Sequence, residues 1–585
     1  MQKKSRLKKS VWTKFKILFA RYLEKRCSMN YNILIGGSAG QGMETTASIL
    51  ETVLKRKGME CFSIRDYMSR IRGGHNFIQI RFSQEKIYSH QDQLDAIIAV
   101  NDETVEIHKE RLNKGGFIVG GTDAIKDDRK LSIDIAAMAK EIGNAKVSGS
   151  VAIGVVLKMF GFELKDVKEI LQDFFNDKIL ELNFSAVKKG FDTAEKKWSL
   201  KEREDNNRFL INGNQAIALG ALSAGVKFYS AYPMTPSTSI MNYISSKMKD
   251  AKVVVEQAED EIAGINMAIG ASFAGVRAMT GTSGGGFCLK VEALGLSGMM
   301  EIPLVVANIQ RPGPVTGFPT RTEQADLRFA ISAGHGEFPK MVIAVRDPED
   351  AFYQTVRAFN LADKYQIPVI LLGDQYHADS TVTLDAFDFD KVTVQRYLAD
   401  ASDFKDKEYK RYEYTKDGIS KRLIPGKAFG SVVLADSDEH DEGGFITESA
   451  DVKVKMTHKR MKKMELLKEE LQEPSFFGQD NCDTLLVGWG STQGALMEAV
   501  ESLKSEGKSV GALVYGDIYP LPTKRFLEKA KTAKTIINVE QNATGQLGGL
   551  LVENTGICPH RSILKYDGRQ MSAGFIIESF KGGGV

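Results

Sequence analysis

The sequence predicts an α/β protein built from three successive α/β units with mainly parallel sheets. Short apolar runs alternate with helical patterns after residue 29, again after residue 209 and again after about residue 483. Such alternation favours parallel strands covered by helices on both faces. Charged or irregular segments separate the three regions, and a chain of 585 residues is long enough for several domains.

We expect six segments along the chain. In order, they are a basic, disordered tail, a first α/β domain, a polar linker, a second α/β domain, an irregular connector with a charged helix, and a third α/β domain: 1–28, 29–200, 201–208, 209–380, 381–475 and 476–585. The tail holds ten Lys/Arg and one Glu, so removing its +9 from the chain's +3 leaves −6 for the rest. A mildly acidic body does not indicate a nucleic-acid partner.

Targeting and metal-binding signals are weak. Lys14 and Lys16 interrupt the apolar stretch of the tail, so neither a signal peptide nor a transmembrane segment is expected. A surface-seeking or transit helix, and upstream sequence before a start at Met29, are the alternatives to a disordered tail. The five cysteines lie far apart without a C-x-x-C pair. This spacing argues against a disulfide framework, a structural zinc or an iron–sulfur cluster held by this chain alone. A reduced, cytoplasmic protein without a metal site of its own is the prediction.

The first α/β domain begins with a strand at 31–35, a glycine-rich turn at 36–42 and a helix from 44 to about 57. Further strands are expected at 60–64, 96–100, 116–119 and 145–147. Glycines at a strand-to-helix turn let backbone amides approach an anion, which makes Gly36, Gly40 and Gly42 candidate contacts. The third glycine of G-x-G-x-x-G is missing, which counts against a dinucleotide. Arg72, in a loop of cations and glycines, is a second candidate; a solvated basic turn is the alternative.

The second domain is expected to place three segments at one edge of its sheet. Its predicted strands are 227–231, 253–255, 277–280, 304–307, 340–345 and 369–372. The loop 232–238, the acidic run 256–261 and the loop 307–326 each follow a strand, and ligands bind at the carboxyl ends of strands in open α/β sheets. Carboxylates also suit a helix N-terminus, which is the structural explanation for the acidic run.

Thr235 and Arg311 together predict a receptor for a carboxylate. Thr235 lies in a loop stiffened by two prolines, and Arg311 stands just past a strand end in a Pro/Gly loop. A guanidinium matches a carboxylate with two parallel hydrogen bonds.

The helix at 452–471 is interpreted as a solvated connector. The third domain, with strands at 484–489, 510–515 and 535–539, leads into the run 540–546.

Several of these motifs resemble one known family. The runs 232–238, 256–275, 282–287 and 311–326 resemble the α subunit of 2-oxoacid:ferredoxin oxidoreductases, although Gly285 stands where the family commonly has proline. The first domain, with 36–42 and 70–75, resembles the family's γ subunit fused ahead of α. The run 540–546 resembles its transketolase-C-like domain. The γ-then-α order is most similar to the 2-oxoglutarate branch.

The resemblance implies a reaction and its cofactors. Thiamine diphosphate supports decarboxylation of a 2-oxoacid, electrons pass through iron–sulfur clusters to ferredoxin, and the acyl group moves to coenzyme A. This chain lacks a Gly-Asp-Gly motif followed by Asn, the family's signature for Mg²⁺ and diphosphate. The resemblance therefore implies a β subunit that carries Mg²⁺ and a 4Fe–4S cluster, with thiamine diphosphate shared between the chains. A heterodimer or a dimer of heterodimers is expected.

The resemblance also implies roles for individual residues. Glu261 is the expected cofactor-activating carboxylate, with Glu259 as the alternative register. The expected substrate-binding residues are Tyr232, Thr235, Arg311, Thr320 and Arg321. A distal carboxylate of the substrate would need a second cation, which either Arg321 or a lysine of the β subunit would supply. Gly36, Gly40, Gly42 and Arg72 are the expected contacts to coenzyme A phosphates.

Other functions stay open from the sequence. Pyruvate or a branched-chain 2-oxoacid is an alternative substrate of the same enzyme type. A transketolase-like or acetolactate-like thiamine enzyme, a nucleotide-dependent dehydrogenase built on 36–42, and a non-catalytic scaffold are alternative classes. The dehydrogenase is disfavoured by the missing glycine.

Overall fold

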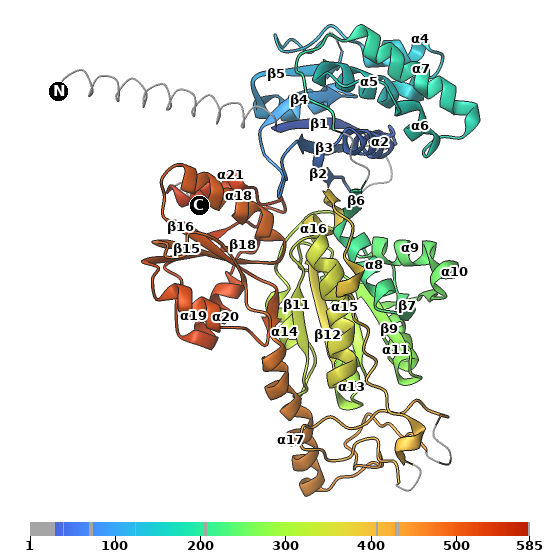
Figure 1. Ribbon diagram of the computed structural model, residues 1–585, viewed down its shortest axis with the longest axis vertical. Coiled ribbons are helices and arrows are strands. Elements are labelled where there is room, and N and C mark those ends of the chain that lie inside the picture. Colours follow the sequence, from blue (N-terminus) through green and yellow to red (C-terminus); the bar gives the residue numbers. More distant parts are fainter. Residues whose placement is uncertain are drawn as a thin grey trace, which may run out of the picture. The chain divides into compact units, whose positions relative to one another are not determined.

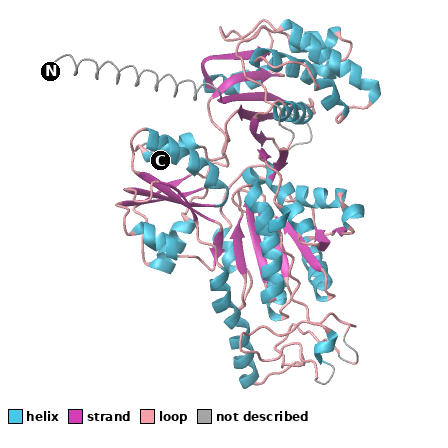
Figure 2. Ribbon diagram, viewed as in Figure 1, coloured by secondary structure: helices cyan, strands magenta, loops and turns pink. Residues whose placement is uncertain are grey.

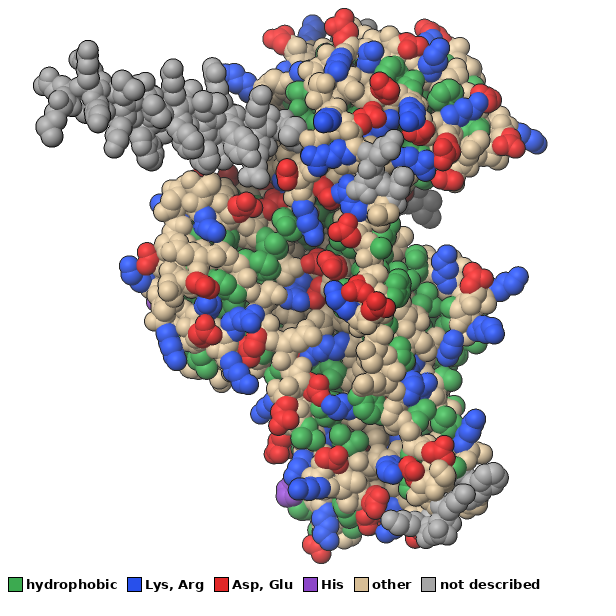
Figure 3. Space-filling view, in the orientation of Figure 1, with side chains coloured by type: hydrophobic (Ala, Val, Ile, Leu, Met, Phe, Trp, Pro, Cys, Tyr) green, Lys and Arg blue, Asp and Glu red, His purple; other side chains and the backbone are tan. Residues whose placement is uncertain are grey.

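The computed structural model describes residues 30–38, 40–69, 74–122, 124–203, 207–404, 408–427, 430 and 432–582. The chain divides into two compact units, residues 1–210 with 381–385 and residues 211–380 with 386–585. Within the described ranges, no helix has both the length and the apolar character needed to cross a membrane. Figure 3 shows basic and acidic side chains interspersed over the face drawn. The expected tail at 1–28 and Arg72 lie outside the described residues.

The first unit is built on a seven-stranded sheet in the order β5-β4-β1-β3-β2-β13-β6 (Figure 1). Its strands are β1 (Asn30–Ser38), β2 (Glu60–Asp66), β3 (His75–Ser83), β4 (Leu94–Ala99), β5 (Leu112–Gly120), β6 (Phe209–Asn212) and β13 (Thr381–Leu384). β3 runs antiparallel to β1 and β2, and β13 runs antiparallel to β2, whereas β1, β4 and β5 are parallel. This sheet is therefore mixed, because the chain inserts β3 where the sequence showed no strand signal.

The helices of this unit bury two apolar clusters against the sheet, the smaller of which contains Val105 of α3. They are α2 (Met43–Arg56), α3 (Asp102–His108), α4 (Ile135–Glu141), α5 (Ser148–Phe160), α6 (Val167–Gln172) and α7 (Asp177–Thr193), with short 3-10 turns at η1 (Lys109–Arg111) and η2 (Ala145–Val147). The predicted strand at 145–147 is wrong: the side chain of Asn144 caps this segment by accepting the amide of Lys146. α5 and α7 approach closely where α5 carries Gly154, because only a residue without a Cβ leaves room there for the carbonyl of Val187.

The central sheet of the second unit has the order β17-β11-β12-β10-β9-β7-β8. Its strands are β7 (Val226–Ala231), β8 (Val254–Gln257), β9 (Arg277–Thr282), β10 (Leu304–Gln310), β11 (Met341–Ala344), β12 (Pro368–Asp374) and β17 (Asp517–Tyr519). All pairs are parallel except β11 with β17. All six strands predicted for this domain are confirmed.

Helices cover both faces of the central sheet (Figure 2). They are α8 (Gly213–Ser223), α9 (Thr238–Ser246), α10 (Met248–Ala251), α11 (Glu261–Phe273), α12 (Gly284–Cys288), α13 (Val291–Met299), α14 (Leu327–Ser332), α15 (Pro348–Tyr365) and α16 (Gln375–Asp379). Local sequence sets their starts. α15, for example, begins with Pro348 after Asp347, whose side chain accepts the amide of Asp350 at 2.9 Å.

A smaller sheet forms the end of the second unit, in the order β14-β16-β15-β18-β19. It comprises β14 (Ser475–Gly478), β15 (Thr484–Trp489), β16 (Val510–Tyr515), β18 (Thr535–Glu540) and β19 (Arg561–Leu564), with η6 (Gly490–Thr492), α18 (Gln493–Ser505), α19 (Lys524–Ala530), α20 (Gln546–Thr555) and α21 (Ala573–Phe580). The three strands predicted here are confirmed. β17 leaves this domain and pairs with β11 of the central sheet, with Val342 opposite Tyr519.

The connector contains η3 (Phe389–Lys391), η4 (Ala401–Phe404), α17 (Ala450–Leu467) and η5 (Lys468–Glu470). The interpretation of its helix as solvated is wrong on one face. Lys459 and Lys463 of α17 are buried and both donate to the carboxylate of Glu301, Lys459 at 2.6 Å. Burial would raise the pKa of Glu301, but the two ammonium groups hold it below its usual range. The pairing fixes the helix to the central domain.

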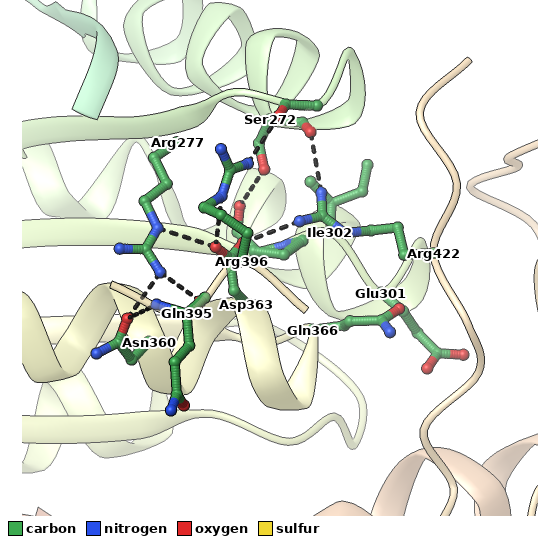
Figure 4. A network of polar contacts seen from close by, with 12 residues as sticks. Ser272, Arg277, Glu301, Ile302, Asn360, Asp363, Gln366, Gln395, Arg396 and Arg422 are labelled. Carbon is green, nitrogen blue, oxygen red and sulfur yellow. Dashed lines mark hydrogen bonds and ion pairs between the residues drawn. The ribbon is translucent and has the colours of Figure 1, made fainter. Parts of the chain in front are cut away.

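Asp363 forms ion pairs with three arginines, two of which come from the connector (Figure 4). Asp363 of α15 accepts from Arg277 at 2.9 Å, from Arg396 at 3.2 Å and from Arg422 at 2.9 Å. Arg396 and Arg422 belong to the connector, and Arg277 begins β9. Burial lowers the pKa of Arg422 to about 10 against the opposing charge of Asp363. The irregular connector is thus held by ionic contacts in a buried position.

Candidate active site

The carboxyl ends of four neighbouring strands bring the predicted segments together. β8, β7, β9 and β10 lie side by side and parallel, so the loops that follow them emerge at one edge of the sheet. The loop 232–238 follows β7, Glu261 follows β8, the glycine loop 283–286 follows β9, and Arg311 follows β10 directly. Ligand sites form at such an edge because several chain segments end there.

Arg311 contacts the predicted hydroxyl loop directly. Its Nη1 donates to the carbonyl oxygen of Thr235 at 2.8 Å. Its Nε is buried and has no partner among the described residues. Burial lowers the pKa of Arg311. The guanidinium therefore keeps donor capacity in a partly desolvated place, beside Thr235, which is half-buried, and near Tyr232, which is 41% exposed.

Glu261 is held inward at the first turn of α11. Asp260 caps the helix by accepting the amide of Ala263 at 2.7 Å, which fixes the orientation of the next residue. Glu261 is only 5% exposed, and no described protein group donates a hydrogen bond to its carboxylate. A buried carboxylate without a donor is costly, so such groups commonly serve a ligand. Glu259, two residues earlier, is exposed.

Gly286 shows that the segments touch. A Cβ there would lie 2.5 Å from Oε1 of Glu261 and would also collide with Oγ1 of Thr282. Thr282 lies 3.9 Å from Sδ of Met234, in the loop after β7. Glycine at 286 is therefore required for the close approach of this loop to Glu261. Thr282 contacts the loop after β7 at Met234, and Gly286 lies between Thr282 and Glu261, so the three segments are in contact with one another.

Two further buried polar atoms at this edge lack partners within the described part of the chain. Oγ of Ser283 follows β9, and Oδ1 of Asn308 stands in β10, whose register places Asn308 opposite Thr282. Buried hydroxyl and amide groups are normally hydrogen-bonded. A polar, planar ligand such as an aminopyrimidine ring fits this set, since it presents both donors and acceptors. Sequence patterns did not single out either residue.

The loop after β10 is anchored at its far end by the C-terminal domain. The amide of Gln324 donates to the carbonyl of Gln541 at 2.7 Å, and its side chain donates to the carbonyl of Trp489 at 3.0 Å. Thr320, within the loop, is 8% exposed. Arg321 packs beside Gly568, where a Cβ would lie 3.3 Å from Cβ of Arg321. The C-terminal domain thus shapes the loop that carries Arg311.

The same loop holds two carboxyl groups with raised pKa values, which sequence reasoning did not single out. Burial raises the pKa of Asp326 to about 6, although Asn308 donates to it at 3.3 Å. Burial and the charge of Asp326 raise the pKa of Glu323 to about 7. A Cβ at Gly284 would lie 2.6 Å from Oδ2 of Asp326, so this pair lies against the glycine loop.

We expect stability to fall with rising pH because of this pair. Both pKa values are raised above the unfolded values of about 4, so their stabilising contribution is complete below pH 4 and is lost as pH rises through about 6 for Asp326 and about 7 for Glu323. Asp326→Asn and Glu323→Gln should therefore raise the melting temperature at pH 8 and flatten its decline between about pH 4 and 8. The exposed Glu465→Gln serves as control. Melting curves that coincide with wild type at every pH would contradict the expectation.

In the first unit, the glycine turn leads from β1 into α2. Gly40 and Gly42 have φ of 90° and 75°, and a Cβ at either would meet no atom within 4 Å. Gly36 lies inside β1, where a Cβ would come 3.2 Å from the ring of His75 and closer to Thr104. The turn is thus open at Gly40 and Gly42 and packed at Gly36.

Three family models match successive parts of the chain. They are the pyruvate ferredoxin/flavodoxin oxidoreductase model at residues 32–193, the thiamine-diphosphate-binding model of pyruvate flavodoxin/ferredoxin oxidoreductase at 219–459, and the core domain II model of pyruvate:ferredoxin oxidoreductase at 482–572. Together with the polar edge of the central sheet, they define a thiamine-diphosphate-binding oxidoreductase.

Proteins with similar sequences and structures show to which family of these oxidoreductases the chain belongs. The 2-oxoacid:ferredoxin oxidoreductase subunit alpha of Sulfolobus sp is 33% identical, with 92% of this chain and 95% of that protein covered. The 2-oxoglutarate oxidoreductase subunit KorA of Mycobacterium tuberculosis is 28% identical over 84% and 82%. The solved 2-oxoglutarate:ferredoxin oxidoreductase of Magnetococcus marinus, with 2-oxoglutarate, coenzyme A and succinyl-CoA bound, superposes with a TM-score of 0.88 at 32% identity, covering 95% of this chain and 99% of that one. The chain belongs to the 2-oxoacid:ferredoxin oxidoreductases and matches their alpha subunits.

Proposed function

We propose that this chain supplies the pyrimidine-side half of the active site of a 2-oxoglutarate:ferredoxin oxidoreductase. The observation that carries the proposal is Glu261, a buried carboxylate without a protein donor at the ligand-binding edge of the central sheet. The substrate follows from two relatives, in Mycobacterium tuberculosis and Magnetococcus marinus, whose names specify 2-oxoglutarate. The six-segment domain division and a cytoplasmic location are part of the same proposal.

Glu261 would act on the cofactor. When bound, thiamine diphosphate supplies the carbanion that adds to the 2-oxo carbon and accepts the electron pair left by CO₂. Glu261 would accept and hold a proton at the aminopyrimidine ring, and burial removes competing water from that exchange. Ser283 and Asn308, with buried polar atoms still unpartnered among the described groups, would bind the ring edge. Glu259 is the less suitable candidate because it is exposed.

Arg311 and Thr235 would bind the 2-oxoacid carboxylate. The hydrogen bond from Nη1 to the Thr235 carbonyl orients the guanidinium, and the remaining donors are left for a carboxylate. Tyr232 and Thr320 would border the substrate, Tyr232 from the loop after β7 and Thr320 from the loop after β10. For the distal carboxylate of 2-oxoglutarate, Arg321 or a lysine of the β subunit would supply the second cation.

A β subunit would complete the site. Large apolar side chains are exposed on the elements that follow these strands, in α11 and in the loops after α12 and β10: Ile262 (51%), Leu289 (50%), Val315 (84%) and Phe318 (58%). Exposed apolar side chains gathered around a site favour a protein partner. That partner would bring Mg²⁺, the diphosphate site and a 4Fe–4S cluster and pass electrons to ferredoxin, in a heterodimer or dimer of heterodimers. Gly36, Gly40, Gly42 and Arg72 of the first unit would contact coenzyme A phosphates.

The proposal is tested by co-expressing the chain with its β subunit and following reduction of a viologen dye. The panel contains 2-oxoglutarate, pyruvate and a branched-chain 2-oxoacid, each with and without coenzyme A. We expect coenzyme A-dependent reduction with 2-oxoglutarate, and about 10²-fold loss of kcat/KM in Arg311→Met, the size of a lost charged hydrogen bond of about 3 kcal/mol. Preference for another 2-oxoacid would overturn the substrate, and no activity with any of them would overturn the function.

A further inference from the structure

Lys290 is a fully buried lysine next to the candidate active site. It stands between α12 and α13, and its side chain has 0% exposure, whereas its neighbour Leu289 is 50% exposed. Lysine is among the residues least often buried, and a buried ammonium is usually paired with a carboxylate. Sequence reasoning missed it, because a lysine at the start of a helix is normally solvated.

The partners of Lys290 are neutral. Its Nζ donates to the backbone carbonyl of Glu261 at 2.8 Å and to Oγ1 of Thr280 at 3.1 Å. Within the described ranges, no carboxylate oxygen lies within ion-pair distance of this ammonium, whereas the buried Lys459 and Lys463 reach Glu301. The ammonium thus joins the first turn of α11 to β9, with one of its three donors unused.

The electrostatic surroundings of Lys290 come from the same turn. Burial lowers the pKa of Lys290 to about 8, against the opposing effect of the Glu261 and Asp260 charges. β9 contributes only the neutral Thr280 hydroxyl, and the carboxylate of α13, Glu292, is exposed. The two charges that act on Lys290 are therefore the helix cap and the candidate catalytic carboxylate, with which the interaction is mutual.

We propose that Lys290 is a positioning residue for Glu261: its ammonium ties the first turn of α11 to β9 and keeps a positive charge beside a carboxylate that has to be ionised. The inference rests on the proposed role of Glu261 and adds a residue to it. A carboxylate that accepts a proton from a cofactor ring needs both a fixed place and a charge set by its surroundings. Lys290 supplies the first through its hydrogen bond to the backbone carbonyl of Glu261 and the second through its charge.

The pH profile of the assembled enzyme tests the charge. In Lys290→Met, which keeps an unbranched side chain one atom shorter and removes the charge, the acid limb of the kcat profile should move to higher pH by about one unit, the size expected for one nearby charge. The alkaline inflection near pH 8 that loss of the Lys290 proton would produce should disappear. Lys340→Met is the matched control, because Lys340 is also buried, also has a pKa lowered by burial to about 8, and donates to the carbonyl of Ala333.

Hydrogen exchange tests the positioning without turnover. In the full chain, Lys290→Met should raise amide exchange about tenfold in the first turn of α11, residues 261–265, the effect of losing one hydrogen bond of about 1.4 kcal/mol. Lys340→Met should leave these amides unchanged. Thr280→Val keeps the charge and should raise exchange less, with the pH profile unmoved; it carries the positioning test if Lys290→Met does not fold.

The outcomes separate the two proposals. An unmoved pH profile together with unchanged exchange in Lys290→Met would overturn the role of Lys290. If Glu261→Gln keeps full turnover, the proposed role of Glu261 fails, and the shift of the pH profile is lost with it. The exchange result then still reports whether Lys290 holds the helix start.

Discussion

Replacing Glu261 with glutamine is expected to lower turnover of the assembled enzyme by about 10²–10⁴-fold, the usual contribution of a positioned acid–base group. The fold should not suffer. The carboxylate is buried and has no hydrogen-bond donor among the described residues, but its charge interacts with that of Lys290, so removing it both relieves a desolvation cost and loses this attraction. The melting temperature should therefore stay close to that of the wild type. Dye reduction with a 2-oxoacid and coenzyme A measures turnover, and a thermal melt of the same preparation measures stability.

Glu259→Gln distinguishes the two registers of the acidic run. Glu259 is exposed and precedes the cap of α11, so we expect its variant to retain activity. The exposed Glu256→Gln is a matched control in the same run. Loss of activity in the Glu259 variant with retention in the Glu261 variant would transfer the role to Glu259. Loss of both activity and stability in the Glu261 variant would indicate a structural role.

Replacing Asp363 with asparagine is expected to lower the free energy of unfolding of the second unit by about 3–5 kcal/mol, the cost of removing one partner from a buried ion pair. The carboxylate neutralises a group of three guanidiniums, and the side chains of Arg277 and Arg422 are only 1% and 5% exposed (Figure 4). Asparagine keeps the volume but leaves these charges uncompensated. Urea unfolding measures the loss, and limited proteolysis should show earlier cleavage in the connector, which Arg396 and Arg422 anchor.

Asp403→Asn is the control for this result. Asp403 pairs with Lys421 in the same connector, but the two side chains are 38% and 60% exposed. Exposed pairs contribute about 0–1 kcal/mol. Equal unfolding midpoints for the Asp363 and Asp403 variants would show that the arginine cluster does not hold the connector.

The sequence predicted the architecture where the hydrophobic pattern and the turn residues at its ends indicate the same element. The strands of the central and C-terminal sheets are apolar runs bounded by turn residues, and these were confirmed. The mixed sheet of the first unit was harder to predict, because β3 carries the polar residues Gln79 and Arg81 in its buried stretch. Polar residues at buried positions hide a strand when their partners lie inside the protein. Asn144 shows another limit, since its side chain caps the segment Ala145–Val147 as a 3-10 helix where a strand was expected.

The convergence of the candidate-site loops was predictable for a related reason. Loops after parallel strands must share an edge, so the contact between Arg311 and Thr235 follows from order along the chain. The buried basic residues were not predictable, because a sequence does not show which groups surround a cation. Lys290, Lys463 and Arg422 each have the appearance of a surface cation until Glu261, Glu301 and Asp363 are placed beside them.

The pairing of β17 with β11 constrains the order of events during synthesis. β11 ends at Ala344 and its edge partner begins at Asp517. At about 5–20 residues per second, the ribosome needs on the order of 10–30 s to make the segment between them. Throughout this interval the nascent central sheet has an open edge, the kind of surface that recruits foreign strands. The domain that contains β17 is therefore also the one that closes the sheet carrying the candidate active-site loops.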